Sequence, residues 1–549
     1  MSETLVSPPA RETAPARFPN LSQFKVLVSE PLSDTGIEVL AKAGLPADVK
    51  TDLSREALLA EIGNYDALIV RSATKVDREL LTAGRKLRVV GRAGVGLDNV
   101  DLKAATERGV LVVNAPSGNV VSAAEHSVAL LLAMLRKIGE AQVSLKAGEW
   151  KRTKFVGIEL MGKTVGLVGL GQVGARVAAR LKPWQVTLLA YDPYASAAKA
   201  AEVGAELVSL DDVLTRSDIV SLHTPSTPET AGLINAERIA KMKDGAFLVN
   251  CARGTLIDDA ALVAALDSGK LGGAALDVFT VEPPKDFTLM KHPRITCTPH
   301  LGASTVEAQD RVAVETVEML VEALSGSPFV PAVNLPFPPG GDAHSALPWM
   351  RLAERVGEFA GQVAQGAPSQ VAVSLTGVPE GAQKACFVSA LKGLLSSSLG
   401  AESVNLVNAA TLAKQQGFSV IETIVAREGG FANTIEVSVT TATGVRSAAG
   451  TLFGDRVGRM VAVDGLPLEF NPEGTCLVIT NQDVPGVVGR IGTLLGTRGV
   501  NISDFALARS GQRKAAAVIR IDTPSGAARD LVDAVSKLEG IESVSLVVL

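Results

Sequence analysis

Short runs of apolar and β-branched residues alternate with stretches of helical periodicity from Phe24 onward. The first runs are KVLVSE, ALIVRS, LRVVGRAG and GVLVVNAP, and the apolar spacing predicts a helix over 34–43. Strands that are apolar at every position are typical of a parallel sheet covered by helices on both faces. The first hundred residues therefore predict an α/β domain.

A second series of the same kind follows. The Ala- and Leu-rich segment SAAEHSVALLLAMLRKIGEA is long enough to favour a helix over a strand. From Thr164 to about residue 310, the strands TVGLVGL, TLLAYD, DIVSLHT, AFLVNCA and AALDVF alternate with helical patterns. We expect two Rossmann-like, doubly wound α/β domains with a cleft between them.

The last third of the chain has a different pattern. A proline-rich stretch, PAVNLPFPPGGDAHSALP, has the composition of an interdomain linker. An α/β segment follows with the candidate strands QVAVSLTG and NTIEVSVTT. The final segment has the order strand, helix, strand, strand, helix, strand, which predicts a small ferredoxin-like domain. That fold is compatible with many functions.

These patterns predict six segments along the chain. They are a disordered tail (1–23), a first α/β domain (24–121 with 311–334), a second α/β domain (122–310), a linker (335–344), an intervening domain (345–472) and a ferredoxin-like domain (473–549).

Composition narrows the classes of function. The 549 residues carry a formal net charge of −5 with no long Lys/Arg run, so we expect neither nucleic acid nor a membrane surface as a partner. The four cysteines have no CxxC spacing, which disfavours a disulfide framework or a metal site and suits a reducing cytoplasm. We expect no membrane-spanning helix, and residues 1–23 lack the features of a signal or transit peptide.

One glycine-rich turn fits a dinucleotide fingerprint. Gly169, Gly171 and Gly174 follow the strand TVGLV and open a helix, and Asp192 stands at the end of the next strand. The helix N-terminus would face the pyrophosphate, and the acid would accept hydrogen bonds from the adenosine ribose. A carboxylate there repels a 2′-phosphate, so NAD is expected rather than NADP. Glycines used only for packing are the alternative.

A second glycine-rich stretch, VVGRAGVGLDNVD, fails the same test. No third glycine follows Gly96 at the required spacing, and the next strand ends without a carboxylate. It carries Arg92, which suits an anionic substrate when free backbone N–H groups lie beside it. The hypothesis is a substrate anion pocket, and the alternative is a tight turn with a solvated arginine.

Three polar residues downstream of the fingerprint could assist the oxidation of a hydroxy acid by the cofactor. Such a reaction needs a base for the hydroxyl proton and a cation for the carboxylate. His300 is the candidate base, Glu282 its partner and Arg253 the cation. Each alone is weak evidence, because a lone histidine is more often a loop residue. His126 lies in an apolar helix and is interpreted as packing, whereas His223 could line the cofactor cleft.

Several of these motifs together resemble the D-2-hydroxyacid dehydrogenases, and most closely the long-form D-3-phosphoglycerate dehydrogenases. The motifs are VRSATKV (70–76), VVGRAGVGLDNVD, GLGQVG, NCARGTLID, ALDVFTVEPP and TPHLGAST. The resemblance implies oxidation of 3-phospho-D-glycerate to 3-phosphohydroxypyruvate by NAD, the first step of the phosphorylated route to L-serine. It implies that His300 is the acid/base, that Glu282 is its partner, and that Arg253 holds the carboxylate and the reacting oxygen.

The resemblance also implies the remaining site residues. Substrate contacts would come from Arg71, Ser72, Arg92, Gly94 and Val95, the last through its N–H because some relatives carry threonine there. Cofactor contacts would come from Gly169, Gly171, Gln172, Val173, Gly174, Asp192, Thr224, Cys251, Arg253, Asp277, His300, Gly302 and Ala303. The family implies a dimer, or a tetramer, in which Arg152 or Lys154 of one copy reaches the other copy's substrate phosphate.

The C-terminal segment resembles an ACT domain, a module that binds small molecules at paired interfaces. Asn481, Asp483 and Asn501 match the positions that hold serine in feedback-inhibited relatives. In the intervening segment, Arg456 and Arg459 could bind an anionic ligand or could simply be an exposed basic pair. Two other functions stay open: a hydroxypyruvate or glyoxylate reductase, and a nucleotide-sensing binding protein of the corepressor type.

Overall fold

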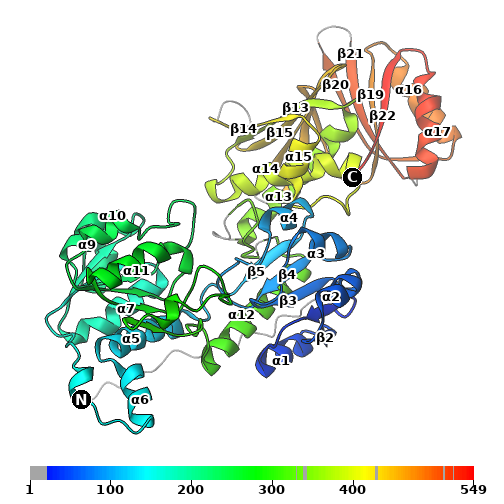
Figure 1. Cartoon of the computed structure of the whole chain (residues 1–549). Coiled ribbons are helices and arrows are strands. Elements are labelled where there is room, and N and C mark those ends of the chain that lie inside the picture. The colour runs from blue at the N-terminus through cyan, green and yellow to red at the C-terminus, as the bar shows by residue number, and fades with distance from the viewer. Residues whose placement is uncertain are drawn as a thin grey trace, which may run out of the picture.

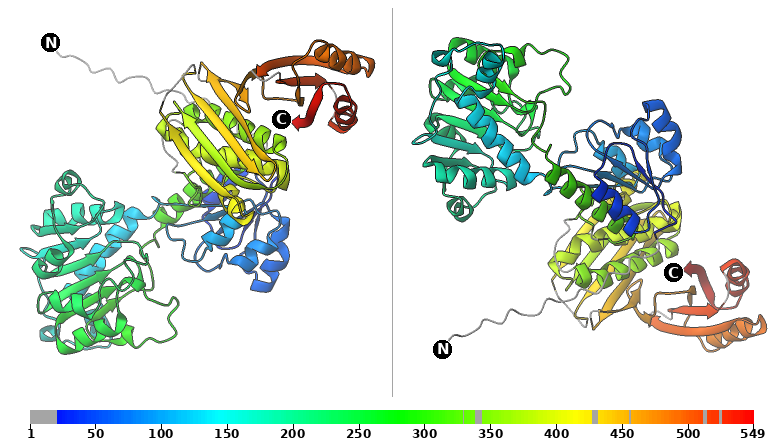
Figure 2. Two further views of the ribbon diagram at one scale, coloured as in Figure 1. Left: turned by 90° about the horizontal axis from the view of Figure 1, so that it is seen from above. Right: turned by 90° about the horizontal axis from the view of Figure 1, so that it is seen from below.

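Four β-sheets follow one another along the chain (Figure 1). The structure is a computed structural model that describes residues 21–328, 330–337, 343–426, 431–454, 456–510, 514–522 and 525–549. The predicted tail therefore lies outside the described residues up to residue 20, and the predicted linker is described only in part. The views in Figure 2 place the second and fourth sheets at opposite ends of the molecule.

The first sheet has five parallel strands in the order β2-β1-β3-β4-β5. The strands are β1 (Val26–Val28), β2 (Ala47–Val49), β3 (Ala67–Val70), β4 (Val89–Arg92) and β5 (Leu111–Asn114). The helices are α1 (Asp34–Lys42), α2 (Arg55–Glu61), α3 (Arg78–Ala83) and α4 (Leu102–Glu107). Each helix begins after a Ser or Asp whose side chain accepts a backbone N–H of the first turn. All four residues of β3 are buried, as expected for a sheet covered on both faces.

The second sheet has seven parallel strands in the order β12-β11-β10-β9-β6-β7-β8. The strands are β6 (Thr164–Val168), β7 (Thr187–Tyr191), β8 (Ala205–Leu207), β9 (Ile219–Leu222), β10 (Ala246–Asn250), β11 (Leu271–Leu276) and β12 (Ile295–Cys297). The helices are α5 (Val120–Leu135), α6 (Ile138–Lys146), α7 (Gln172–Leu181), α8 (Ala197–Glu202), α9 (Leu210–Arg216), α10 (Ala236–Lys241) and α11 (Asp259–Ser268). The long apolar segment is two helices, because Lys137 takes a left-handed conformation between α5 and α6.

The chain crosses between the first two sheets twice. It leaves the first sheet after β5 to enter α5, and it returns in α12 (Val306–Leu324), which packs against β4, β5 and α1. Gly91 allows this packing, since a Cβ there would lie 2.9 Å from a methyl of Thr316. The carboxyl ends of both sheets consequently face one cleft, where ligands of parallel α/β sheets bind.

The third sheet is mixed, with the order β14-β13-β15-β16-β17-β18. The strands are β13 (Pro368–Thr376), β14 (Ser419–Val425), β15 (Thr434–Thr441), β16 (Gly444–Phe453), β17 (Val457–Val463) and β18 (Leu466–Phe470). The helices are α13 (Ala343–Val363), α14 (Glu380–Leu399) and α15 (Ala409–Gln415). Just before α15, Asn405 Nδ2 donates to the carbonyl of Gly109, which follows α4. This hydrogen bond joins the third domain to the first.

The fourth sheet is antiparallel, with the order β20-β21-β19-β22. It comprises β19 (Thr475–Gln482), β20 (Asn501–Ser510), β21 (Lys514–Asp522) and β22 (Ile541–Val548), with α16 (Val487–Thr497) and α17 (Ser525–Ser536). One face of this sheet packs into the same apolar core as α13, and Gln362 of α13 hydrogen-bonds both the N–H and the C=O of Val548. The third and fourth sheets are therefore joined by a shared core.

The predicted fold class is confirmed. Two parallel Rossmann-like sheets are followed by a mixed α/β sheet and by a sheet with the predicted ferredoxin-like order of strands and helices. No helix among the described residues is long and apolar enough to cross a membrane.

Candidate active site

The fingerprint glycines occupy the turn between β6 and α7, and each has a separate reason to be glycine. Gly169 has φ of +99°, and a Cβ there would lie 2.7 Å from the carbonyl oxygen of His223. A Cβ on Gly174 would collide with the carbonyl oxygen of Gly169. No atom lies within 4 Å of the place of a Cβ on Gly171. Two glycines thus permit the turn and the helix packing, and Gly171 leaves open space beside the helix N-terminus.

The carboxylate of Asp192 lies beside this turn. One of its oxygens accepts the N–H of Leu170 and the other accepts the N–H of Tyr194, both at 2.8 Å. Gln172 and Val173 are the first two residues of α7, so their N–H groups point out of the helix end. The fingerprint, the helix N-terminus and the acid are therefore brought together as the sequence predicts.

Polar residues follow β9 and β10, the two strands that precede β6 in the sheet order. The hydroxyl of Thr224 is buried and has no hydrogen-bond partner among the described residues. Burial raises the pKa of the Cys251 thiol to about 12, so this side chain is neutral. Burial lowers the pKa of His223 to about 4, and its Nε2 lies 2.9 Å from Ser221 Oγ. The orphaned Thr224 hydroxyl and the open space at Gly171 fit a bound dinucleotide.

His300 and Glu282 form an ion pair at the cavity. Among the described residues, it is the only ion pair at this cavity that involves a histidine. His300 Nδ1 lies 2.5 Å from Glu282 Oε2, and Glu282 Oε1 accepts the N–H of Phe279. The hydrogen bond that His300 donates to Glu282 raises the pKa of His300 above its ordinary value. Burial works to raise the pKa of Glu282, but the bonds from His300 and Phe279 outweigh it, and the pKa falls. The pair is therefore suited to holding a proton on the imidazole.

The loop that carries His300 is wrapped around Asp277. Asp277 Oδ1 accepts the N–H of Leu301, Oδ2 accepts the N–H of Gly302, and the Asp277 carbonyl accepts the N–H of His300. The Asp277 side chain is fully buried. It holds the loop in place, and the cofactor contact that the resemblance implies for Asp277 stays a prediction.

The stretch around Gly94 places an arginine against the backbone. Gly94 has φ of +151°, and a Cβ there would collide with the guanidinium of Arg92. Burial lowers the pKa of Arg92, and the positive charge of Arg253 lowers it further. Arg92 Nε is buried without a hydrogen-bond partner among the described residues. Two neighbouring guanidinium groups, one incompletely paired, favour an anion between them.

Arg253 connects the two halves of the cleft. It follows β10 and begins a short 3-10 helix, and its Nε lies 3.3 Å from Asp98 Oδ2 in the loop after Gly94. A Cβ on Gly96 would collide with the Arg253 guanidinium. Arg253 is therefore held against the first domain's glycine-rich loop.

The loop with Arg71 and Ser72 is held by two residues that the sequence did not single out. Glu30 accepts the N–H groups of Arg71, Ala73 and Thr74 at 2.8–3.0 Å. Asn99 Nδ2 donates to the carbonyls of Arg71 and Thr74. The N–H groups of Arg71, Ala73 and Thr74 are thereby occupied, whereas the N–H of Ser72 and the side chains of the loop stay available to a ligand.

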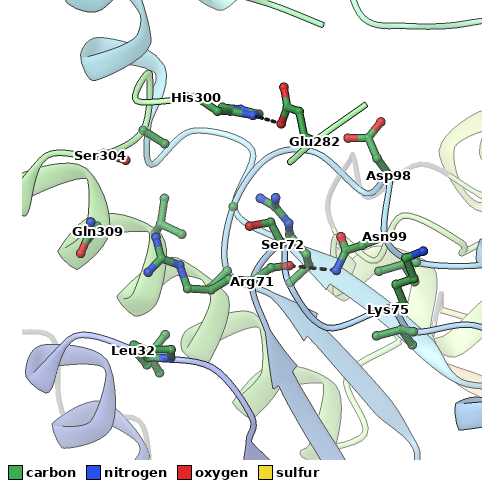
Figure 3. A pocket seen from close by; sticks show the side chains of 18 of the residues that line it. Leu32, Arg71, Ser72, Lys75, Asp98, Asn99, Glu282, His300, Ser304 and Gln309 are labelled. Atoms are coloured by element: carbon green, nitrogen blue, oxygen red, sulfur yellow. Dashed lines mark hydrogen bonds and ion pairs between the residues drawn. The ribbon is translucent and has the colours of Figure 1, made fainter. Parts of the chain in front are cut away.

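One cavity of about 770 Å³ brings many of the predicted residues together. Figure 3 shows His300 and Glu282 on one side and Arg71, Ser72 and Asn99 on the other. The predicted residues that line it are Arg71, Ser72, Arg92, Gly94, Glu282, His300 and Ala303. Val95 and Arg253 do not line it. It is also lined by residues that the sequence did not single out: Lys75, Asp98, Asn99 and Ser304, which lie inside the quoted motifs, and Gln309 in the first turn of α12.

His126 also differs from its interpretation as a packing residue. Its Nε2 lies 3.1 Å from Asp277 Oδ1 and 2.9 Å from Thr298 Oγ1. Its polar partners come from loops more than 150 residues away in sequence. Its apolar neighbours in the helix gave no sign of them.

The three residues predicted to bind serine do not all lie close to one another within one chain. Asn481 is 3% exposed and donates to the carbonyl of Gln482, and Asp483 pairs with Arg509. Asn501 hydrogen-bonds Asp522 at the other end of the sheet. The register places the partners of Asn481 and Asn501 on β21 seven residues apart, which is roughly 23 Å of extended chain.

The predicted basic residues elsewhere are exposed. Arg152 and Lys154 lie in the 3-10 helix Arg152–Phe155, with Lys154 Nζ 5.6 Å from the centre of the Phe155 ring. Arg456 is exposed and Arg459 is partly exposed on β17, and neither forms an ion pair within the described part of the chain.

Comparisons with known proteins assign three segments of the chain to protein families. The family model described as "D-isomer specific 2-hydroxyacid dehydrogenase, NAD binding domain" matches residues 128–302. The "D-3-phosphoglycerate dehydrogenase intervening domain" matches 346–464, and the "ACT domain" matches 477–543. A D-3-phosphoglycerate dehydrogenase of Archaeoglobus fulgidus is 42% identical over 96% of this chain and 100% of its own length. The chain belongs to the D-3-phosphoglycerate dehydrogenase family.

Other relatives agree with this family. The D-3-phosphoglycerate dehydrogenase of a Synechocystis species is 41% identical over 100% of this chain and 99% of its own length. Among solved structures, a glyoxylate reductase from Paecilomyes thermophila has a TM-score of 0.51 and 30% identity, and it covers 55% of this chain and 95% of its own length. The chain is thus an NAD-dependent dehydrogenase, and the predictions of NAD and of an ACT domain are confirmed.

Proposed function

We propose that this member of the D-3-phosphoglycerate dehydrogenases oxidises 3-phospho-D-glycerate to 3-phosphohydroxypyruvate, the first step of phosphorylated L-serine biosynthesis. The observation that carries this is the cavity in which the His300–Glu282 pair faces Arg71 and Arg92 of the other domain. A substrate with a hydroxyl between two anionic groups needs such an acid/base with cations around it.

The cofactor residues would be those around the fingerprint turn. The N–H groups of Gln172 and Val173 would hold the pyrophosphate over Gly171, and Asp192 would hold the adenosine ribose. The unpaired hydroxyl of Thr224 would gain a partner. When bound, NAD accepts the hydride from C2 of the substrate.

His300 would remove the proton of the substrate hydroxyl. Its Nδ1 is held by Glu282, which leaves Nε2 free to face the substrate. Glu282 raises the pKa of His300, so the imidazole retains the proton that it takes up. In the reverse direction the same protonated imidazole would donate to the keto oxygen.

The two anionic groups of the substrate would be held by different cations. Arg253 would bind the carboxylate and the reacting oxygen, with Arg92 and the backbone at Gly94 and Val95 beside it. Arg71 and Ser72 would bind the phosphate side, joined by Arg152 or Lys154 of a second copy.

A dimer around the NAD-binding domains is supported by exposed apolar side chains on α6 and the following segment. These are Ile138 (52% exposed), Val143 (70%), Leu145 (57%), Trp150 (77%), Val156 (71%) and Met161 (63%). Exposed apolar side chains concentrated in one segment are typical of an interface. Arg152 and Lys154 lie within the same segment.

Serine would act as a feedback inhibitor at the ACT domain. Asn481 and Asp483 lie at one end of the sheet and Asn501 at the other, so a site with all three would need two copies of the domain. The four cysteines are free thiols, which suits our proposal of a cytoplasmic location.

The test of the proposed function is NAD-linked turnover by the purified full chain. We expect 3-phosphoglycerate to have a kcat/KM at least 100-fold above those of D-glycerate and D-lactate, because these lack the phosphate (roughly 3 kcal/mol for an unpaired cation). Activity on an unphosphorylated hydroxy acid with none on 3-phosphoglycerate, in either direction, would overturn it. Activity that millimolar serine leaves unchanged would overturn the regulatory part alone.

A further inference from the structure

His126 reaches from α5 into the base of the catalytic loop. Helix α5 packs against β11 and β12, and the side chain of His126 is 20% exposed. Its Nε2 lies 2.9 Å from Thr298 Oγ1 and 3.1 Å from Asp277 Oδ1. His126 does not line the cavity, so any effect on the reaction passes through these two partners.

The hydrogen bonds fix which atom of His126 carries the proton. Thr298 Oγ1 lies 2.6 Å from Asp277 Oδ1, and a carboxylate can only accept, so the single hydroxyl proton of Thr298 is given to Asp277. Thr298 Oγ1 is then an acceptor toward His126. Nε2 of His126 must therefore carry a hydrogen, which it shares between Thr298 and Asp277.

The same carboxylate of Asp277 also accepts hydrogen bonds from the 300–302 loop. Its Oδ1 also accepts the N–H of Leu301 at 2.7 Å, and its Oδ2 accepts the N–H of Gly302 at 2.8 Å. Immediately before these contacts, His300 has φ of +53°, a conformation that non-glycine residues adopt only when their surroundings hold them. The orientation of the Asp277 carboxylate thus decides where His300 stands relative to Glu282.

We propose that His126 is a positioning residue for the dehydrogenase reaction: its Nε2–H, with Thr298, fixes the Asp277 carboxylate that holds the 300–302 loop in its active shape. This rests on the proposed function. The groups that face His300 are Glu282, Asp277 and Arg253. A loosened loop would weaken the bond to Glu282, and the pKa of His300 would return toward its ordinary value.

The test compares His126→Leu, which removes the donor, with His126→Gln, whose amide N–H can occupy the place of Nε2–H. His292→Leu is the matched control, because His292 also pairs with an aspartate, Asp267, in the same domain but away from the cavity. Thr298→Val removes the second donor to Asp277 and serves as an independent variant if His126→Leu does not fold.

The expected result is a roughly tenfold fall in kcat for His126→Leu, the usual effect of losing a hydrogen bond to a charged group. The acid limb of kcat/KM should move to lower pH, while KM for NAD changes less than twofold. His126→Gln should regain most of the activity, and His292→Leu should match the unchanged protein. Wild-type kcat and pH limb in His126→Leu, or equal impairment of the Leu and Gln variants, would overturn the proposal.

Amide hydrogen exchange separates this proposal from the proposed function. The Leu301 and Gly302 N–H groups should exchange faster in His126→Leu than in the unchanged protein, with protection restored in His126→Gln. This holds whether or not 3-phosphoglycerate is the substrate. Unchanged protection in His126→Leu contradicts the positioning role, whereas absent turnover by the unchanged protein contradicts only the proposed function.

Discussion

At the scale of single residues, the proton chemistry that we propose for the cleft depends on the 2.5 Å contact between His300 and Glu282. This contact raises the pKa of His300 and lowers that of Glu282, so each partner stabilises the charge of the other. Oxidation of a hydroxyl requires His300 to be unprotonated at the start. Its rate should therefore decline as the pH falls through the raised pKa of His300.

Replacement of Glu282 by Gln should shift the acid limb of the pH profile, the pH range in which the rate of oxidation declines. The carboxylate is the main cause of the raised pKa, so the acid limb of kcat/KM for oxidation should move to lower pH in Glu282→Gln. We expect kcat to fall about 10- to 100-fold, because the imidazolium loses its partner. Initial rates of NADH formation between about pH 5 and pH 9 measure both effects. A limb that stays at the wild-type pH would show that another group titrates there.

The sequence named residues whose side-chain chemistry suits the reaction and missed those that act through tertiary contacts. His300, Glu282 and Arg92 stand in recognisable stretches, and the structure places all three at one cavity. Glu30, Asn99 and His126 hold the loops of that cavity through partners far along the chain. Such partners depend on how the strands stack, which no local pattern contains.

At the scale of elements, the turn between β6 and α7 shows why three glycines stand at fixed spacing. Gly174 lets the helix approach the turn, and Gly169 allows its left-handed conformation. Gly171 meets nothing in the protein itself. The strand and helix order was predictable here because apolar strands and a glycine-rich turn are local signals. The break at Lys137 between α5 and α6 was not, since the sequence there continues a helical pattern.

Two alanine substitutions separate these roles. Gly171→Ala should leave the free energy of unfolding within about 0.5 kcal/mol, since its φ of −68° suits alanine. Its dissociation constant for NAD should rise at least tenfold, because the methyl fills the pyrophosphate space. Gly174→Ala should lower the free energy of unfolding by about 1–3 kcal/mol, because the methyl meets the carbonyl of Gly169.

Urea unfolding and NAD titration of both variants give the comparison. Unchanged NAD affinity in Gly171→Ala would place the pyrophosphate elsewhere.

At the scale of the whole molecule, catalytic and regulatory parts are joined end to end. The third and fourth sheets share a core through α13, and Asn405 bonds the third domain to Gly109 near β5 of the first. The ACT domain is therefore connected to the domain that carries Arg92 through this core and this hydrogen bond. The sequence predicted the order of these domains, but contacts between them could not be read from it.

The exposed apolar group on α6 and the following segment gives a prediction for assembly. Trp150→Asp should convert the protein to a smaller species in sedimentation equilibrium and lower its activity, because Arg152 and Lys154 would lose their place at the partner's cavity. Trp184→Asp is the control, since Trp184 is also partly exposed, at 46%, but lies in another short helix. Unchanged sedimentation of Trp150→Asp would contradict the proposed interface.

The central claim is that the cavity between the first two sheets carries the reaction and that His300 is its acid/base. The most direct measurement is kcat/KM for NAD-linked oxidation of 3-phosphoglycerate by the unchanged protein and by His300→Asn, with NAD affinity determined in parallel. We predict turnover by the unchanged protein and a loss of roughly 100- to 10,000-fold in His300→Asn with NAD binding little changed. Turnover in His300→Asn equal to that of the unchanged protein would contradict the account.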